Sequence, residues 1–119
     1  MTEKRNQEQW AASHRPNASF CLVSTGVGTT GSLLTTDIIT AAGGGPVKFV
    51  RLTLSGMEGW LVRTNDPIPA LPVSTTPVDV EGSQAVTSVA SVFIDMKNVD
   101  RLNFRSFGTS RNYLTIECW

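Results

Sequence analysis

The stretch DRLNFRSFGTSRNYLTIECW (residues 100–119) threads arginines among aromatic side chains. This mixture is typical of a surface that stacks on single-stranded nucleic acid, which needs cations and aromatic rings on the same exposed face. Successive side chains of a strand, however, point to opposite faces, so Phe104 lies on the face opposite Arg101 and Arg105. The alternation therefore favours a strand of a β-sheet with an apolar inner face.

The same alternation continues through residues 112–118, whose apolar side chains share one face. Residues 108–110, Gly-Thr-Ser, are typical turn residues and separate this segment from residues 101–104. We predict that the two segments form the closing hairpin of a sheet. Glu117 then faces an arginine of the partner strand as a cross-strand ion pair.

Upstream, the chain consists of short alternating runs separated by Gly, Pro, Ser and Thr. No stretch shows a long apolar period of 3.6 residues, so helices are not expected to dominate. The remaining expected strands are residues 19–24, 35–42, 47–55, 60–64 and 86–96. Of these, the segments on either side of the glycine turn at 56–59 are expected to form a hairpin, and residues 26–32 are expected to be a loop.

Two segments are less regular. Residues 35–42 read as a strand, although Leu34 and Ile38 also suit one turn of a helix. Residues 65–77 contain four prolines, which cannot donate to a β-ladder and predict an exposed connection or an edge. Seven or eight short strands at this spacing indicate an all-β protein, with a single β-sandwich of jelly-roll or immunoglobulin-like type preferred over a closed barrel.

The 119 residues fit one domain, which we assign to residues 17–119. Residues 1–16 are polar and could form a short helix, a free arm or a clasp on a neighbour. Because they cannot bury enough surface to order on their own, a flexible N-terminal arm is the preferred prediction. Trp10 is the single large apolar group of this arm. We therefore expect the arm to become ordered against a partner, with Trp10 as its anchor.

Ten basic and ten acidic residues leave the chain without formal net charge. No net field then draws it to nucleic acid or to an anionic membrane, and neither is expected as a specific partner. Residues 64–96 carry four acidic and no basic side chains, whereas residues 97–119 carry four basic and two acidic ones. Such a dipolar layout suits docking onto a complementary surface such as a second copy, while solvated faces of unequal charge are the commoner explanation.

Catalytic and metal-binding patterns are weak. The one histidine, His14, lies in the arm, so no nucleophile has a base beside it in a recognisable spacing. The carboxylate pairs Asp79/Glu81 and Asp95/Asp100 lack the surroundings of a glycosidase site. Asp95, Asn98 and Asp100 are more typical of a turn than of calcium ligands. We therefore expect no enzyme, cofactor or metal site.

Cys21 and Cys118 each lie in a predicted strand, with no spacing typical of a zinc site. The N-terminal residues contain no apolar core of a secretory signal, so synthesis and folding in a cytosol are expected. Buried, reduced thiols are the preferred prediction, and a disulfide is the alternative should the two strands be neighbours.

Residues 50–70, 91–106 and 107–118 together resemble a pattern found in small β-sandwich virion proteins of tailed bacteriophages. The pattern is an alternating strand, a glycine turn, a second strand, a proline-containing connection, a strand with a central aromatic, and a final strand pair with a Gly-Thr/Ser tip. The longer proline-rich segment and the glycine run at 43–45 depart from it. The resemblance implies a non-enzymatic protein of the virion that decorates a capsid, connects head to tail or anchors fibres, as a homo-oligomer and with other virion proteins.

Under this interpretation, the candidate partner contacts are aromatic and basic side chains at the two ends of the chain: Trp10, Trp119, Arg101, Arg105 and Arg111. The alternative function is a carbohydrate-binding β-sandwich for host or cell-wall recognition. In that case Trp60 or Tyr113 would supply the ring on which a sugar stacks.

Overall fold

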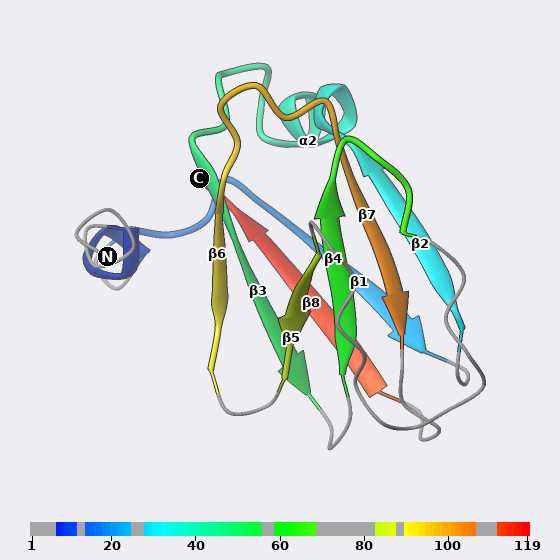
Figure 1. Cartoon of the computed structure of the whole chain (residues 1–119). Helices are drawn as coiled ribbons and strands as arrows, with labels where there is room; N and C mark the ends of the chain where they lie inside the picture. Colours follow the sequence, from blue (N-terminus) through cyan, green and yellow to red (C-terminus); the bar gives the residue numbers. More distant parts are fainter. Residues whose placement is uncertain are drawn as a thin grey trace.

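Eight strands in two four-stranded antiparallel sheets make up most of the computed structural model, which describes residues 7–11, 14–24, 28–55, 59–68, 83–87, 90–106 and 112–119 (Figure 1). The elements are β1 (Ala18–Ser24), β2 (Thr30–Leu34), α2 (Thr35–Ala41), β3 (Phe49–Ser55), β4 (Trp60–Thr64), β5 (Gln84–Val86), β6 (Val92–Asp95), β7 (Arg101–Ser106) and β8 (Asn112–Cys118). Residues 7–11 are also helical and are called the arm helix below. The all-β prediction is thus confirmed, with a sandwich-like arrangement.

Sheet A has the strand order β1-β8-β3-β6, and sheet B has the order β2-β7-β4-β5. The pairs β1–β8, β2–β7, β3–β6 and β4–β5 are all antiparallel. The first strand therefore pairs with the last, the second with the seventh, the third with the sixth and the fourth with the fifth. Two further pairs, β3–β8 and β4–β7, join these ribbons into the two sheets.

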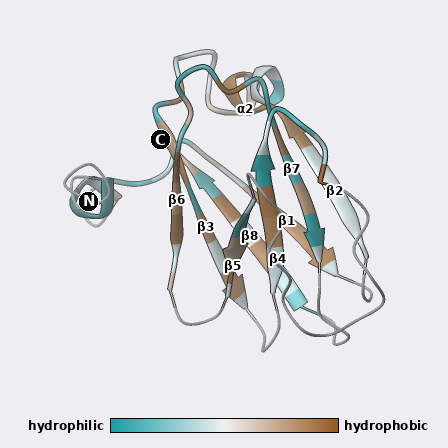
Figure 2. Ribbon diagram, in the orientation of Figure 1, coloured by the Kyte–Doolittle hydropathy of each residue, from teal (hydrophilic) through white to brown (hydrophobic). Residues whose placement is uncertain are grey.

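The hydrophobic core lies between the sheets, and both contribute alternate residues to it (Figure 2). Val50, Leu52 and Leu54 of β3 point inward from sheet A, and Phe104 of β7 points inward from sheet B. The other members of the buried cluster are Ile38, Trp60, Val62, Val86, Val92, Met96, Leu102, Leu114, Ile116 and Cys118. Phe104 is buried and faces away from the arginines of its strand, as the alternation predicted.

Both predicted hairpins are wrong. β7 and β8 belong to different sheets, as do β3 and β4, so each connection crosses the sandwich. Alternation identifies a strand and the face that it buries, but it does not identify the neighbouring strand. Two strands can bury their apolar faces either as neighbours in one sheet or as members of two sheets that face each other across the core. The predicted ion pair of Glu117 forms with Arg51 of β3, because β8 pairs with β3.

The segment 35–42 is a helix rather than the preferred strand, and the alternative of a helical turn was the correct one. Ile38 of α2 is fully buried and caps one end of the core. After the helix, Gly43 and Gly44 adopt φ values of 94° and 88°, and the N–H of Gly44 donates to Ile39 O at 2.8 Å. This left-handed ending suits glycine and terminates the helix. The expected loop at 26–32 is also partly wrong, because β2 begins at Thr30.

Only the start of the proline-rich segment, residues 65–68, lies within the described residues. Asn65 there has φ 67°, donates its backbone N–H to Arg101 O at 2.8 Å, and accepts the N–H of Asp100 on Oδ1 at 2.7 Å. Asp79, Glu81 and Arg111 lie outside the described residues. Of the described helices, none has the length and apolar character that a membrane crossing requires.

The two cysteines lie on opposite faces of sheet A. β1 and β8 are neighbours, but Cys21 is paired with Thr115 and Cys118 with Ala18, and both thiols are free. Cys118 is buried in the core as predicted, whereas Cys21 is exposed, which contradicts the prediction for that residue. The disulfide alternative does not form, because a β-sheet separates the two thiols.

This arrangement predicts a large difference in thiol reactivity. In the native protein, one equivalent of Ellman's reagent should react quickly with Cys21, and Cys118 should react at least about 100-fold more slowly because it requires opening of the core. Cys21→Ala should abolish the fast phase, and denaturant should equalise the two rates. Two equally fast thiols in the folded protein would contradict the burial of Cys118.

Stability should also depend on pH in the alkaline range. Burial, with a smaller contribution from Glu117, raises the pKa of Cys118 from 9.0 to about 11. The unfolded chain therefore loses this proton more readily than the folded protein. The stability that the protonated thiol contributes is fully present below pH 9 and is lost as pH rises through about 11. Chemical denaturation at a series of pH values should show a steeper alkaline decline for wild type than for Cys118→Ala, with Cys21→Ala resembling wild type.

Candidate assembly interface

An aromatic cluster lies on the outer face of sheet A, where polar side chains are the norm. Phe49 precedes the inward Val50 and therefore points outward, yet it is only 6% exposed. Its ring stacks on Trp119 at 5.2 Å between centroids and 15° between planes, and it contacts Phe93 at 6.0 Å. The outer ends of β3, β6 and β8 thus carry a second, smaller apolar centre outside the main core.

Trp119 connects this cluster to the N-terminal arm. Its carbonyl oxygen accepts the N–H of Lys48 at 2.6 Å, and its own N–H donates to Phe49 O at 3.0 Å, which continues the β3–β8 pairing. Its indole Nε1 donates to His14 O at 3.0 Å, across 105 positions of sequence. Trp119 is therefore buried, at 4% exposed, and fixes the C-terminal part of the arm at His14 to the domain.

The arm helix bears the other aromatic anchor. Trp10 stacks on His14 with centroids 3.6 Å apart and planes 2° apart, and Nδ1 of His14 lies 2.9 Å from Trp10 O. Nζ of Lys48 lies 5.1 Å from the centre of the Trp10 ring, a cation–π distance. Trp10 is nevertheless 42% exposed. The described residues of the arm thus contact the domain, while the side chain of Trp10 still presents surface.

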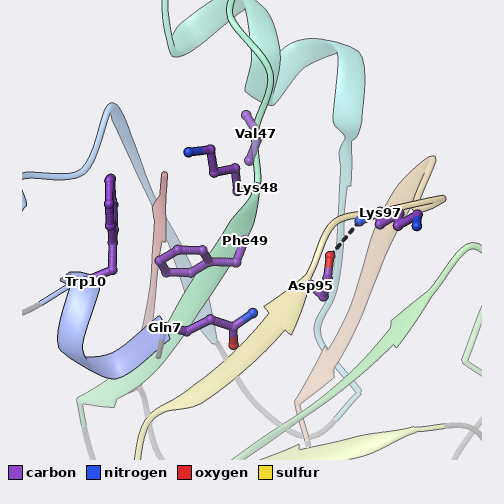
Figure 3. A pocket seen from close by; sticks show the side chains of 7 residues that line it. All are labelled: Gln7, Trp10, Val47, Lys48, Phe49, Asp95 and Lys97. Carbon is purple, nitrogen blue, oxygen red and sulfur yellow. Dashed lines mark hydrogen bonds between the residues drawn. The ribbon is translucent and has the colours of Figure 1, made fainter. Parts of the chain in front are cut away.

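A groove of about 460 Å³ separates the arm helix from sheet A. Figure 3 shows Gln7 and Trp10 on the helix side and Val47, Lys48 and Phe49 on the opposite side. Asp95 and Lys97 close the end, and Asp95 Oδ1 accepts the N–H of Lys97 at 2.9 Å. A second space of about 220 Å³ lies between Glu8 of the helix and Arg51, Ser91 and Phe93 of the sheet. The arm therefore lies on the sheet without filling the space beneath it.

An ion pair borders the aromatic cluster. Arg51 donates from Nε at 3.0 Å and from Nη2 at 2.6 Å to the same carboxylate oxygen, Oε1 of Glu117. The guanidinium carbon lies 5.3 Å from the centre of the Trp119 ring. Charge-assisted bonds between partly buried groups of this kind fix both side chains and hold the indole of Trp119 in place.

The structure separates the predicted partner contacts into two groups. Trp10 and Trp119 line one small pocket beside the arm, whereas Arg101 and Arg105 lie on the outer face of β7 in sheet B. The fifth, Arg111, lies outside the described residues. The aromatic and basic candidates therefore do not form one continuous surface.

The two aromatic residues predicted to stack on a sugar, Trp60 and Tyr113, differ in their exposure. Trp60 is 1% exposed, lies in the core, and donates from Nε1 to Asn112 Oδ1 at 2.6 Å, so it offers no ring to a ligand in this structure. Tyr113, on the outer face of sheet A, is 41% exposed beside Val23 on the neighbouring strand. Of the pair, Tyr113 alone presents its side chain at the surface.

Lys48 and Phe49 line the groove beside the arm helix, and the sequence did not single them out. A signal was present, because Phe49 lies in phase with Arg51 and Thr53 on the polar side of its strand. In the structure, Trp119 and Phe93 cover this aromatic residue on the otherwise polar face. In comparisons with known protein families, with curated proteins and with solved structures, the chain matches none of them.

Proposed function

We propose that the chain is a non-enzymatic structural protein of a bacteriophage virion, which assembles as an oligomer on the capsid, neck or tail. The resemblance of its second half to small tailed-phage virion proteins motivates this function. We further propose that the sandwich is a jelly roll rather than an immunoglobulin-like domain. Pairing of the first strand with the last, the second with the seventh, the third with the sixth and the fourth with the fifth supports this type, which recurs in viral capsid domains.

The observation that carries the proposal is the incompletely packed arm. Trp10 and the groove beside Phe49 place apolar surface on both sides of an open space. A neighbouring subunit that contacts Trp10 and fills this groove would remove that surface from water, at about 25 cal/mol for each Å² of apolar area. Arms and strand edges are common means by which identical subunits join.

Light scattering coupled to size-exclusion chromatography tests this assembly. We expect concentration-dependent oligomers for wild type and a shift toward monomer for Trp10→Ala. Leu34→Ala is the matched control, because Leu34 is a similarly exposed apolar residue, 39% exposed, on sheet B. A wild-type chain that stays monomeric at every concentration, and that also fails to bind phage particles lacking it, would refute the proposed function.

A further inference from the structure

We propose that a pocket on the outer face of sheet B, away from the arm, binds a single oxyanion group, a carboxylate or a phosphate, through Arg105. The pocket has a volume of about 320 Å³. β2 and β7 line it with Thr30, Ser32, Asn103 and Arg105, and the segment Pro67–Ile68 forms its other wall. This inference does not depend on the proposed function.

The sheet register places the polar side chains of the pocket together. Thr30 lies directly opposite Arg105, and Ser32 lies directly opposite Asn103, on the paired strands β2 and β7. Phe104, between the two β7 residues, points into the core, so its neighbours point outward. Directly opposite residues have Cβ atoms about 5 Å apart. Thr30, Ser32, Asn103 and Arg105 therefore form a compact cluster of four polar side chains, called the polar square below.

Arg105 has an unmet hydrogen-bonding requirement in this square. Its Nε is buried, and no hydrogen-bond partner reaches it. A buried donor without a partner is destabilising, and more so when the group is charged. Among the described residues, the ion pairs are Arg51–Glu117 and Arg63–Asp66, and neither involves Arg105. The guanidinium of Arg105 therefore has no anionic partner in the part of the chain that the structure describes, and an oxyanion would supply one.

Ser32 and Asn103 form hydrogen bonds within the protein, so Thr30 and Arg105 are the remaining polar side chains of the pocket. Asn103 donates from Nδ2 to Asp66 O at 2.9 Å and accepts from Ser32 Oγ at 3.3 Å, so its amide is held by the protein itself. No carboxylate lines the pocket among the residues that the structure describes. Thr30 lies directly opposite Arg105 in the strand register, and its hydroxyl can donate a second bond to the same ligand.

The chemistry favours one oxyanion over a polynucleotide. A nucleic-acid groove combines several cations with exposed aromatic rings. Here one guanidinium lines the pocket, and the ring of Phe104 belongs to the core. The arginine fork matches the two oxygens of a carboxylate or phosphate.

Nuclear magnetic resonance of the arginine Nε–H groups tests the site in the full chain. The Arg105 signal is the one missing from the spectrum of Arg105→Gln. Titration with inorganic phosphate and, separately, with acetate is done at constant ionic strength held with sodium chloride. We expect a saturable shift with a dissociation constant on the order of 1 mM. Thr30→Val should weaken binding, and amide spectra establish that each variant is folded.

The matched control is Arg101→Gln, which removes an exposed arginine from the same face of the same strand. Followed through the backbone amide signals of β2, which pairs with β7, binding should persist in this variant and weaken at least about tenfold in Arg105→Gln. A response to phosphate alone assigns the site to phosphate groups, and a response to acetate alone assigns it to carboxylates. No saturable shift with either ion, or equal loss of binding in Arg101→Gln, would overturn the inference.

Discussion

Trp60→Ala is expected to lower the free energy of unfolding by about 3–5 kcal/mol, the range typical of a buried tryptophan reduced to alanine. Trp60 is 1% exposed, so the substitution leaves a cavity between the sheets. It also leaves Oδ1 of the buried Asn112 without the indole N–H that now donates to it at 2.6 Å. Because small domains have only about 5–15 kcal/mol of stability, this single change removes a large part of it.

Guanidinium denaturation followed by circular dichroism measures the effect, with Tyr113→Ala as control. Tyr113 is also a large aromatic residue on a strand, but it is 41% exposed, so its loss should cost less than about 1 kcal/mol. Trp60→Phe should fall between the two, because it keeps most of the ring and removes the donor. Equal losses for Trp60→Ala and Tyr113→Ala would mean that Trp60 does not lie in the core.

Trp119→Ala should have the second largest effect, with a loss of about 2–4 kcal/mol and release of the arm. The substitution removes the stack on Phe49, the indole bond to His14 O and the ring beneath Arg51. Hydrogen exchange should then become faster in residues 7–17, as well as at the start of β3. The backbone bonds of position 119 remain possible, so the sheet itself should persist.

Trp10→Ala distinguishes release of the arm from loss of domain stability. This variant loses the stack on His14 but keeps the packing of Trp119 on Phe49. We therefore expect faster exchange in the arm helix with little change in the free energy of unfolding. If Trp119→Ala instead released the arm without any loss of stability, the outer aromatic cluster would not contribute to the domain.

The position and inner face of most strands could be predicted from the sequence, because burial imposes a period of two on the residues of a strand. In β7, the alternation of Leu102 and Phe104 with the arginines was enough to assign the buried face correctly. In β1, Phe20 and Leu22 face the core while Cys21 is exposed, so the inner face was again correct, but a cysteine was wrongly assumed to be buried.

Strand partners could not be predicted, because the register and neighbours of a strand depend on residues far away in sequence. Glu117 illustrates this: its need for a cation was evident, but the cation is Arg51, 66 positions away, instead of an arginine of β7. The helix α2 was ambiguous for a local reason, since seven residues with one fully buried side chain fit either period. The arm contact depends on Trp119 and His14, which meet only after the sheet has formed.

The pairing of β1 with β8 has a consequence for biosynthesis. β1 is an edge strand whose one neighbour in sheet A is β8, and Ser24 must wait for Asn112, roughly 90 residues later, before this ladder can begin. At about 5–20 residues per second, the ribosome needs on the order of ten seconds to deliver that partner. During this interval, the backbone hydrogen-bonding edge of β1 has no partner strand, so folding of sheet A should be largely post-translational and sensitive to capture of the nascent chain by chaperones.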